Sequence, residues 1–310
     1  MLTKQKPLMK NMVILLIFVG ITISCQTEKT KESRLPSKIH INTSEDYELH
    51  KVDNSKKILI LFPGGASTSK EIKEEFDILP IATDNNISVL LMNFNRHLWI
   101  DENQTKGLAK KLDSIFIENK IEKNDVFFGG ISIGGNVVLT LTNYLKQNKY
   151  SIKPKGVFIV DSPIDLYALY ESSIKDVKNT KLTEERLEEP KMIISYFERK
   201  FGVDSLLNNI QKVSPFTMET DWNNVPNLKA IKLRFYIEPD SLWWMENRKT
   251  DFESTNAYAI QQISNHLGKE GWNQIELIET KDKCFKSNGK KHPHSWSIVN
   301  PEELLNWIKE

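Results

Sequence analysis

The sequence predicts an α/β fold with a mostly parallel central sheet, flanking helices and a helical cap insertion. Several strand-like runs, such as "ISVLLMNFN" (87–95), are apolar on both faces, which is typical of parallel strands covered on both sides. Helix-patterned segments separate these runs. The alternation is interrupted from about residue 166 to residue 227, where Glu, Lys and helix-forming residues are frequent. We interpret this block as the cap insertion.

Taken in order, the elements alternate along the chain. We expect strands over residues 47–52, 56–65, 87–95, 125–130, 155–163, 228–240 and 273–280. We expect helices over residues 69–85, 103–121, 134–148, 254–271 and 300–310. Ser67, Thr68 and Ser69 are candidate caps for the first helix. The insertion follows a strand directly, so it should lie at the carboxyl end of the sheet, where ligands bind in open α/β folds.

The composition fits a globular fold and shows no sign of a nucleic-acid binder. The chain has 310 residues, of which 39% are hydrophobic and 27% charged, and its net charge is +1. Acidic and basic residues are interspersed, whereas nucleic-acid-binding surfaces concentrate positive charge in a stripe or patch. We therefore expect no nucleic-acid partner.

The N-terminus predicts export. Three lysines in "MLTKQKPLMKN" precede a short apolar run, "MVILLIFVGITI" (12–23), and small residues follow. A basic segment, a short apolar run and a small residue before the cut form a secretory signal. The run is too short to span a bilayer comfortably. We expect a signal peptide over residues 1–24.

The segment "TISC" (22–25) resembles the lipobox of bacterial lipoproteins, in which a peptidase cuts before a cysteine that is then lipidated. Ile23 and Ser24 fit that pattern. Thr22 departs from it, because leucine is usual at that position, and ordinary secretion is the alternative. The resemblance implies acyl chains on Cys25 that anchor the protein to a membrane, at a periplasmic or cell-surface face.

The polar segment "QTEKTKESRLPSK" follows Cys25. Segments of low hydrophobicity do not bury enough apolar surface to fold, so we expect a tether over residues 25–44 and a domain over 45–310. The second cysteine, Cys284, lies in a lysine-rich stretch without a paired histidine. We expect it to be a bystander thiol.

A serine stands in the middle of the glycine-rich segment "VFFGGISIGGNVVLTLTNYL" (126–145). An apolar strand pattern precedes Ser132 and an amphipathic helix pattern follows it. A sharp strand-to-helix turn strains the backbone and needs small neighbours, which Gly130 and Gly134 provide. Such a turn lifts the hydroxyl above the sheet and aims the first N–H groups of the helix at the same point.

This pattern resembles the nucleophile elbow of the α/β-hydrolase family, and the resemblance covers the layout from about residue 57 to residue 310. It implies that Ser132 is a nucleophile that attacks a carbonyl carbon.

The family also places one oxyanion-hole N–H in a loop after the neighbouring strand, often at a His-Gly-Gly run. Here "LFPGG" (61–65) has Phe-Pro in place of the histidine. The resemblance still implies that Ile133, with Gly65 or Ala66, donates N–H groups to the oxyanion. An ordinary strand-ending turn is the alternative interpretation.

The family's chain order is serine, acid, histidine. His294 follows the last strand and precedes the last helix, where the family places its base, and His292 is the alternative base. A metal site at this His-Pro-His segment is disfavoured, because no carboxylate or cysteine cluster accompanies it.

The acid is expected after the strand at 228–240. Pro239 ends the strand geometry and places Asp240 in the following turn, so Asp240 is the predicted partner of His294. Glu238 is the first alternative. Asp161, at the end of the preceding strand, is the second.

Four tryptophans lie close in sequence to these residues: Trp99, Trp243, Trp244 and Trp296. They are candidates for the walls of a substrate pocket, although core packing explains them equally well. Arg96 is a candidate partner for a substrate carboxylate, or else a surface residue.

The resemblance implies a serine hydrolase with a small-molecule acyl substrate, which cleaves a carboxylic ester or a related acyl bond through an acyl-enzyme, without a metal or organic cofactor. Esters are favoured because the fold serves them most often. One alternative is a non-catalytic surface lipoprotein that uses the fold for binding, suggested by the altered oxyanion segment. The other is a serine peptidase, if the insertion admits only short peptides.

Overall fold

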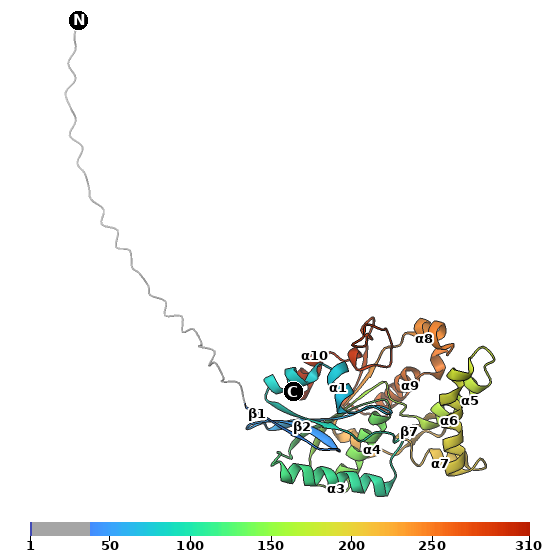
Figure 1. Ribbon diagram of the computed structural model, residues 1–310, viewed down its shortest axis with the longest axis horizontal. Coiled ribbons are helices and arrows are strands. Elements are labelled where there is room, and N and C mark those ends of the chain that lie inside the picture. Colours follow the sequence, from blue (N-terminus) through green and yellow to red (C-terminus); the bar gives the residue numbers. More distant parts are fainter. Residues whose placement is uncertain (2–37) are drawn as a thin grey trace. The chain divides into compact units, whose positions relative to one another are not determined.

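The computed structural model describes Met1 and residues 38–310, and Figure 1 shows this part as a sheet covered by helices. The expected signal peptide, Cys25 and most of the expected tether lie outside the described residues. The strands of the main sheet are β1 (Ile39–Thr43), β2 (Tyr47–Val52), β3 (Lys57–Phe62), β4 (Ile87–Met92), β5 (Asp125–Ile131), β6 (Pro154–Val160), β9 (Lys232–Ile237) and β10 (Ile275–Glu279).

The helices alternate with these strands along most of the chain. They are α1 (Ser69–Glu75), α2 (Ile78–Asp84), α3 (Glu102–Glu118), α4 (Ile133–Gln147), α5 (Leu166–Val177), α6 (Glu184–Phe201), α7 (Leu206–Ile210), α8 (Ser241–Arg248), α9 (Asn256–Lys269) and α10 (Pro301–Lys309). Short 3₁₀ helices include η2 (Pro226–Ala230), η3 (Phe252–Ser254) and η4 (Trp296–Ile298).

The eight strands form one sheet in the order β1-β2-β4-β3-β5-β6-β9-β10. Pairing is antiparallel between β1 and β2 and between β2 and β4, and parallel between all other neighbours. Every residue of β4 is buried, because helices cover both faces of the sheet. The predicted α/β class with a mostly parallel sheet is confirmed.

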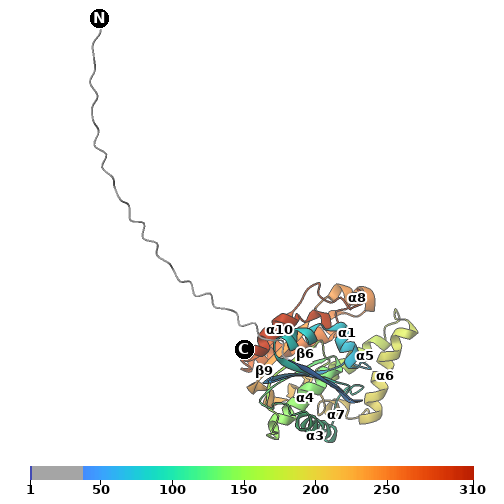
Figure 2. The same ribbon diagram turned by 60° about the vertical axis from the view of Figure 1, so that its left-hand side comes forward.

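Two apolar cores lie on opposite faces of the sheet. One face packs against α3, α4 and α9, and the other packs against α1, α2 and α10. Figure 2 shows α1 and α10 on one side of the strands and α3 and α4 on the other. Because both faces are covered, the exposed ends of the strands are where polar side chains can gather.

Strand β1 corrects the expected end of the tether. Residues 39–43 pair with β2, so the sheet begins before residue 45, where we expected the domain to start. All five residues of β1 are exposed, so no burial pattern marks them in the sequence. Their strand conformation depends on backbone pairing at the sheet edge.

The segment between β6 and β9 contains α5, α6 and α7, a two-stranded hairpin of β7 (Phe216–Thr217) and β8 (Trp222–Asn223), and η2. We call this segment the cap. Its own core is built around Leu166, Phe197 and Ile210, and Trp99 from the loop after β4 joins it. The cap therefore lies next to the carboxyl ends of the parallel strands (Figure 1).

None of the helices within residues 38–310 combines the length and the hydrophobicity required to cross a bilayer.

Candidate active site

Ser132 lies at a strained turn between β5 and α4. Its φ of 55° and ψ of −133° place it outside the conformations that non-glycine residues usually adopt. A Cβ on Gly130 would lie 2.4 Å from the carbonyl carbon of Gly134, and a Cβ on Gly134 would lie 2.4 Å from Pro63 O. Side chains at these two positions would therefore force the turn open. Such a turn is the strand–serine–helix geometry that the sequence predicts.

Backbone hydrogen bonds fix this turn beside the next strand. The N–H of Ser132 donates to Val160 O at 3.0 Å, and the N–H of Gly135 donates to Ser132 O at 2.9 Å. Val160 is the last residue of β6, and Asp161 follows it. The serine is thus held against the end of the strand that carries Asp161.

His294 pairs with Asp161. His294 Nδ1 lies 2.7 Å from Asp161 Oδ2, and the carboxylate side chain is only 4% exposed. An ionised carboxylate accepts hydrogen bonds and cannot donate them, so Nδ1 carries the ring proton and Nε2 is left as an acceptor. Nε2, the ring nitrogen that would accept a proton from a serine, is therefore unprotonated.

The backbone of Asp161 is also strained and firmly held. Its φ is +40°, in the left-handed region. Its N–H donates to Tyr236 O at 2.9 Å, and Asn256 Nδ2 donates to its carbonyl at 3.0 Å. Asn256, which opens α9, thus holds the backbone of the residue whose carboxylate pairs with His294. No motif in the sequence marks Asn256, and its place near the start of an expected helix is the one signal for it.

The predicted acid, Asp240, does not contact His294, and this corrects the sequence-based assignment. Asp240 Oδ2 lies 2.7 Å from Lys291 Nζ, and its other oxygen accepts the N–H of Trp243 at the start of α8. Burial raises the pKa of Asp240, but Lys291 and the Trp243 N–H together bring it below its ordinary value. Asp240 is therefore a helix cap and an ion-pair partner.

The first alternative acid, Glu238, has a different set of partners. Its side chain accepts hydrogen bonds from Thr280 Oγ1 and the Lys283 N–H at 3.0 Å each, and from Cys284 Sγ at 2.8 Å. Glu238 is 2% exposed. These hydrogen bonds anchor the loop that runs from β10 to His294. Glu238 therefore supports the loop that carries His294, whereas Asp161 is the carboxylate that pairs with the ring.

The alternative base, His292, faces an arginine and two tryptophans. Its Nε2 lies 2.9 Å from Arg248 Nη2, and its ring centroid lies 4.6 Å from that of Trp243 and 5.9 Å from that of Trp244. Burial, with the charges of His294 and nearby cations, lowers the pKa of His292 to about 4. His292 is neutral near pH 7 and accepts a hydrogen bond from Arg248.

The expected oxyanion loop follows β3 and reaches Ser132. A Cβ on Gly64 would lie 3.2 Å from Ser132 Cβ, so Gly64 is the glycine required by close approach, whereas a Cβ on Gly65 would meet nothing within 4 Å. Ile133 is the first residue of α4, where a backbone N–H has no partner inside the helix. The N–H groups predicted for the oxyanion thus come from a loop and a helix start that meet at Ser132.

The segment after β4 holds the oxyanion loop in place. The Arg96 N–H donates to Gly65 O at 2.9 Å, and Asn95 Nδ2 donates to Ser67 O. Carbonyl and N–H groups of one trans peptide point in opposite directions, so fixing Gly65 O also fixes the Ala66 N–H. Arg96 has a φ of 62° and an exposed side chain. The positive φ of Arg96 marks a turn, and this turn positions Asn95 and Arg96 to donate their hydrogen bonds to the loop after β3.

The four tryptophans divide into two groups. Trp99 is buried in the cap core and Trp296 is stacked on Phe76 beneath the sheet, with ring centroids 4.9 Å apart. Both are packing residues. Trp243 and Trp244 are partly exposed on α8 beside His292, so these two remain candidates for a substrate wall.

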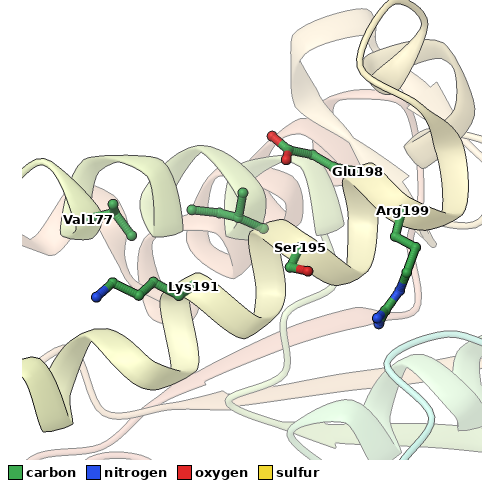
Figure 3. Close-up of a pocket in the computed structure, with 6 residues that line it drawn as sticks. Val177, Lys191, Ser195, Glu198 and Arg199 are labelled. Carbon is green, nitrogen blue, oxygen red and sulfur yellow. The ribbon is translucent and has the colours of Figure 1, made fainter.

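A shallow, open hollow of about 490 Å³ lies elsewhere, between α5 and α6. Figure 3 shows Lys191, Ser195, Glu198 and Arg199 projecting from α6 and Val177 from the neighbouring helix. None of these residues belongs to the serine–histidine–aspartate arrangement. Within residues 38–310, no group of three or more His, Cys, Asp or Glu side chains has the geometry of a metal site.

No protein-family model and no curated protein matches this chain. Solved structures do resemble it. A fluorophosphonate-binding serine hydrolase from Staphylococcus aureus is 11% identical, with a TM-score of 0.52 over 89% of this chain and 100% of that one. An esterase/lipase from an uncultured bacterium is 11% identical, with a TM-score of 0.54 over 87% and 85%. An alpha-beta hydrolase from Vibrio vulnificus is 11% identical, with a TM-score of 0.52 over 88% and 81%.

At these identities the likeness concerns the fold. The order of the strands, the helices on both faces and the solved structures agree, and the chain has the α/β-hydrolase fold.

Proposed function

We propose that this protein is a serine hydrolase that cleaves a carboxylic ester through an acyl-enzyme. The observation that carries the proposal is the pair of His294 and buried Asp161 beside the strained turn of Ser132. A structural serine needs neither the strained turn nor an oriented imidazole. Both features serve a nucleophile that must lose its proton to a nearby base.

Ser132 Oγ attacks the ester carbonyl carbon, and its proton passes to His294 Nε2. Asp161 holds the ring in the tautomer that accepts this proton and stabilises the imidazolium that results. The carbonyl oxygen becomes an oxyanion, which accepts hydrogen bonds from the N–H groups of Ile133 and of Gly65 or Ala66. Collapse of this intermediate expels the alcohol, which takes the proton from His294. Water then attacks the carbonyl carbon of the acyl-enzyme, while His294 again accepts and returns a proton, and the carboxylic acid is released.

The ester substrate class is supported by the neighbouring folds. The solved structures with TM-scores above 0.5 include an esterase/lipase and a serine hydrolase that binds fluorophosphonates. Fluorophosphonates react with serines that a base has activated, which agrees with the role given to Ser132.

Hydrolysis of p-nitrophenyl butyrate by the full chain tests this proposal. We expect Ser132→Ala to lower kcat by more than about 10⁴-fold, because the nucleophile is lost. Ser172→Ala on α5 is the matched control and should keep wild-type turnover, since Ser172 only bonds to Leu169 O in its own helix. Circular dichroism checks that both variants are folded. Turnover retained by Ser132→Ala would refute the proposal.

We also propose that Cys25 carries the lipid anchor implied by the "TISC" segment. Metabolic labelling with a radioactive fatty acid in a bacterial host should mark the wild-type chain and fail to mark Cys25→Ser. Cys284→Ser is the control, because Cys284 is buried in the folded domain. Equal labelling of the wild type and Cys25→Ser would contradict an anchor at this cysteine.

A further inference from the structure

We infer that the active site selects esters that carry a carboxylate, which Arg248 binds beside His292 at the rim of the site. The inference rests on the proposed serine hydrolase function and adds the charge of its substrate. Arg186, at the start of α6, is a second cation whose charge acts on His292. We call the set Arg186, Trp243, Arg248 and His292 the cationic rim.

Arg248 lies close to the proposed base. Its Nη2 is 2.9 Å from His292 Nε2, and the ring centroid of His292 is 6.3 Å from that of His294. The guanidinium carbon also lies 5.8 Å from the centroid of Trp243. One imidazole ring therefore separates the guanidinium from His294, and an aromatic ring restrains its orientation.

In the part of the chain that the structure describes, no carboxylate forms an ion pair with Arg248. Within residues 38–310, ion pairs between arginine and carboxylate side chains involve Arg234 alone. The direct partner of Arg248 is His292, which burial and its neighbours keep neutral. A guanidinium has five N–H donors, and His292 uses one of them. The remaining donors and the full positive charge are available to a ligand.

Arg186 extends the same positive region from the cap. Its charge contributes to the lowered pKa of His292, and its Nε is buried without a hydrogen-bond partner among residues 38–310. The α5–α6 connection reaches the end of α8, where Asn179 Nδ2 donates to Lys249 O at 3.4 Å. A buried donor without a partner is costly, and an anionic ligand would remove that cost.

Two acidic side chains near the rim are paired with lysines. Asp251 pairs with Lys175, and Asp240 pairs with Lys291. Asp176 interacts with the charge of Arg186 but has no ion pair within 4.0 Å among the described residues. The rim thus keeps a net positive charge next to His294.

A carboxylate is the anion that fits this arrangement. The planar guanidinium donates two parallel hydrogen bonds to the two oxygens of a carboxylate, which adds orientation to the charge attraction. Binding such a group at the rim would direct the ester carbonyl toward Ser132. Hydrogen bonds between charged groups commonly change affinity by about 10- to 100-fold.

The test compares esters that differ only in this charge. On the alcohol side, p-(butyryloxy)benzoate is compared with p-(butyryloxy)benzamide. On the acyl side, the p-nitrophenyl monoester of adipic acid is compared with that of its primary amide. We expect kcat/KM of the full chain to be about tenfold or more higher for the anionic member of at least one pair. Equal kcat/KM values in both pairs would overturn the inference.

Variants assign the preference to Arg248. Arg248→Met should reduce the ratio of anionic to neutral kcat/KM by about tenfold or more, and Arg248→Lys should restore part of it. Arg199→Met is the matched control, because Arg199 lies on α6 about 20 Å along the helix from Arg186, and both kcat/KM values should remain unchanged. An equal loss on both substrates in Arg248→Met would show that Arg248 only positions His292, and would refute anion binding. Absence of turnover on all four esters would instead count against the proposed hydrolase function.

Discussion

The Asp161 carboxylate orients His294, and the backbone of Asp161 is strained in the conformation that places it there. Asp161 has a φ of +40° directly after β6, and Ser132 has a φ of 55° directly after β5. Two neighbouring parallel strands thus end in two residues with left-handed backbones. Strain of this kind costs on the order of 1–3 kcal/mol for each residue, and it persists where the surrounding structure determines it. We interpret both residues as parts of one catalytic arrangement.

The roles of Asp161 and Asp240 can be separated by two matched substitutions. Asp161→Asn should lower kcat by about 10³- to 10⁴-fold, because the amide no longer holds His294 in the accepting tautomer. Asp240→Asn should change kcat by less than about tenfold, since Asp240 caps α8 and pairs with Lys291. Steady-state ester hydrolysis by both variants is the measurement. A larger loss of kcat in Asp240→Asn than in Asp161→Asn would show that Asp240 is the acid, as the sequence predicts.

His292 gives the folded state a specific dependence on pH. Its pKa falls from 6.5 to about 4, chiefly through burial, so between these values the unfolded chain binds a proton that the folded chain does not. The free energy of unfolding should therefore decrease as the pH falls from 6.5 toward 4, by about 2 to 3 kcal/mol from this group.

Urea unfolding at pH 7 and pH 4.5 measures this loss in the wild type and in His292→Gln. The wild type should lose about 2 kcal/mol more than the variant. His40→Gln is the control, because His40 is half exposed beside Asp53. Identical losses in the wild type and His292→Gln would show that folding does not lower the pKa of His292.

At the scale of elements, the loop from β10 to His294 is anchored by Glu238. This carboxylate accepts three hydrogen bonds from residues 280–284, and the Cys284 carbonyl accepts the His292 N–H at 2.7 Å. The anchor thus extends from the end of β9 to the residue two positions before His294. A loop that carries a base needs this support, because small displacements of a catalytic group lower the rate strongly.

The reactivity of the Cys284 thiol reports on this anchor. Burial and the Glu238 carboxylate raise the pKa of Cys284 to about 12, so the native thiol should react with Ellman's reagent at least about 100-fold slower than the unfolded chain at pH 8. Glu238→Gln should accelerate the reaction. The amide NH₂ group cannot accept the hydrogen bonds that the loop donates to the carboxylate, so the loop should open more often. A Cys25→Ser background leaves Cys284 as the single thiol.

Glu279→Gln serves as the control for this experiment, because Glu279 is exposed at the end of β10 and bonds to Gln261. If Glu238→Gln and Glu279→Gln react at the same rate as the wild type, Glu238 does not hold the loop closed.

The sequence predicted the parallel strands because each is a short apolar run. It predicted the serine turn because the glycines that the turn requires lie next to Ser132 in the sequence. It could not predict which strand-end carboxylate meets His294. That choice depends on the path of residues 280–294 over the sheet, and Lys291 in the same loop takes Asp240 as its partner. Strand β1 was missed for a related reason, since pairing with β2 defines it.

At the scale of the whole molecule, the cap is attached to the sheet through Trp99. This side chain is 6% exposed, and its ring lies 4.9 Å from Tyr196, 5.3 Å from Phe197 and 5.1 Å from Phe201, measured between centroids. Trp99 belongs to the loop that follows β4, and in the same loop the Arg96 N–H donates to Gly65 O. The cap and the loop after β3 therefore share one support.

Trp99→Ala should reduce the free energy of unfolding by about 3–5 kcal/mol, because it leaves a cavity among three aromatic rings. Trp222→Ala is the matched control. Trp222 is 45% exposed in the β7–β8 hairpin, so its loss should cost less than about 1 kcal/mol. Urea unfolding monitored by circular dichroism measures both values. Equal costs would show that Trp99 does not join the cap to the sheet.

The proposed mechanism requires that His294 activates Ser132. Labelling of the full chain with a fluorophosphonate, followed by mass spectrometry of the labelled peptide, measures this activation. We predict one covalent adduct, on Ser132, that is absent in Ser132→Ala and strongly reduced in His294→Ala. A folded wild type that takes up no label, or that is labelled at another serine, would contradict the mechanism.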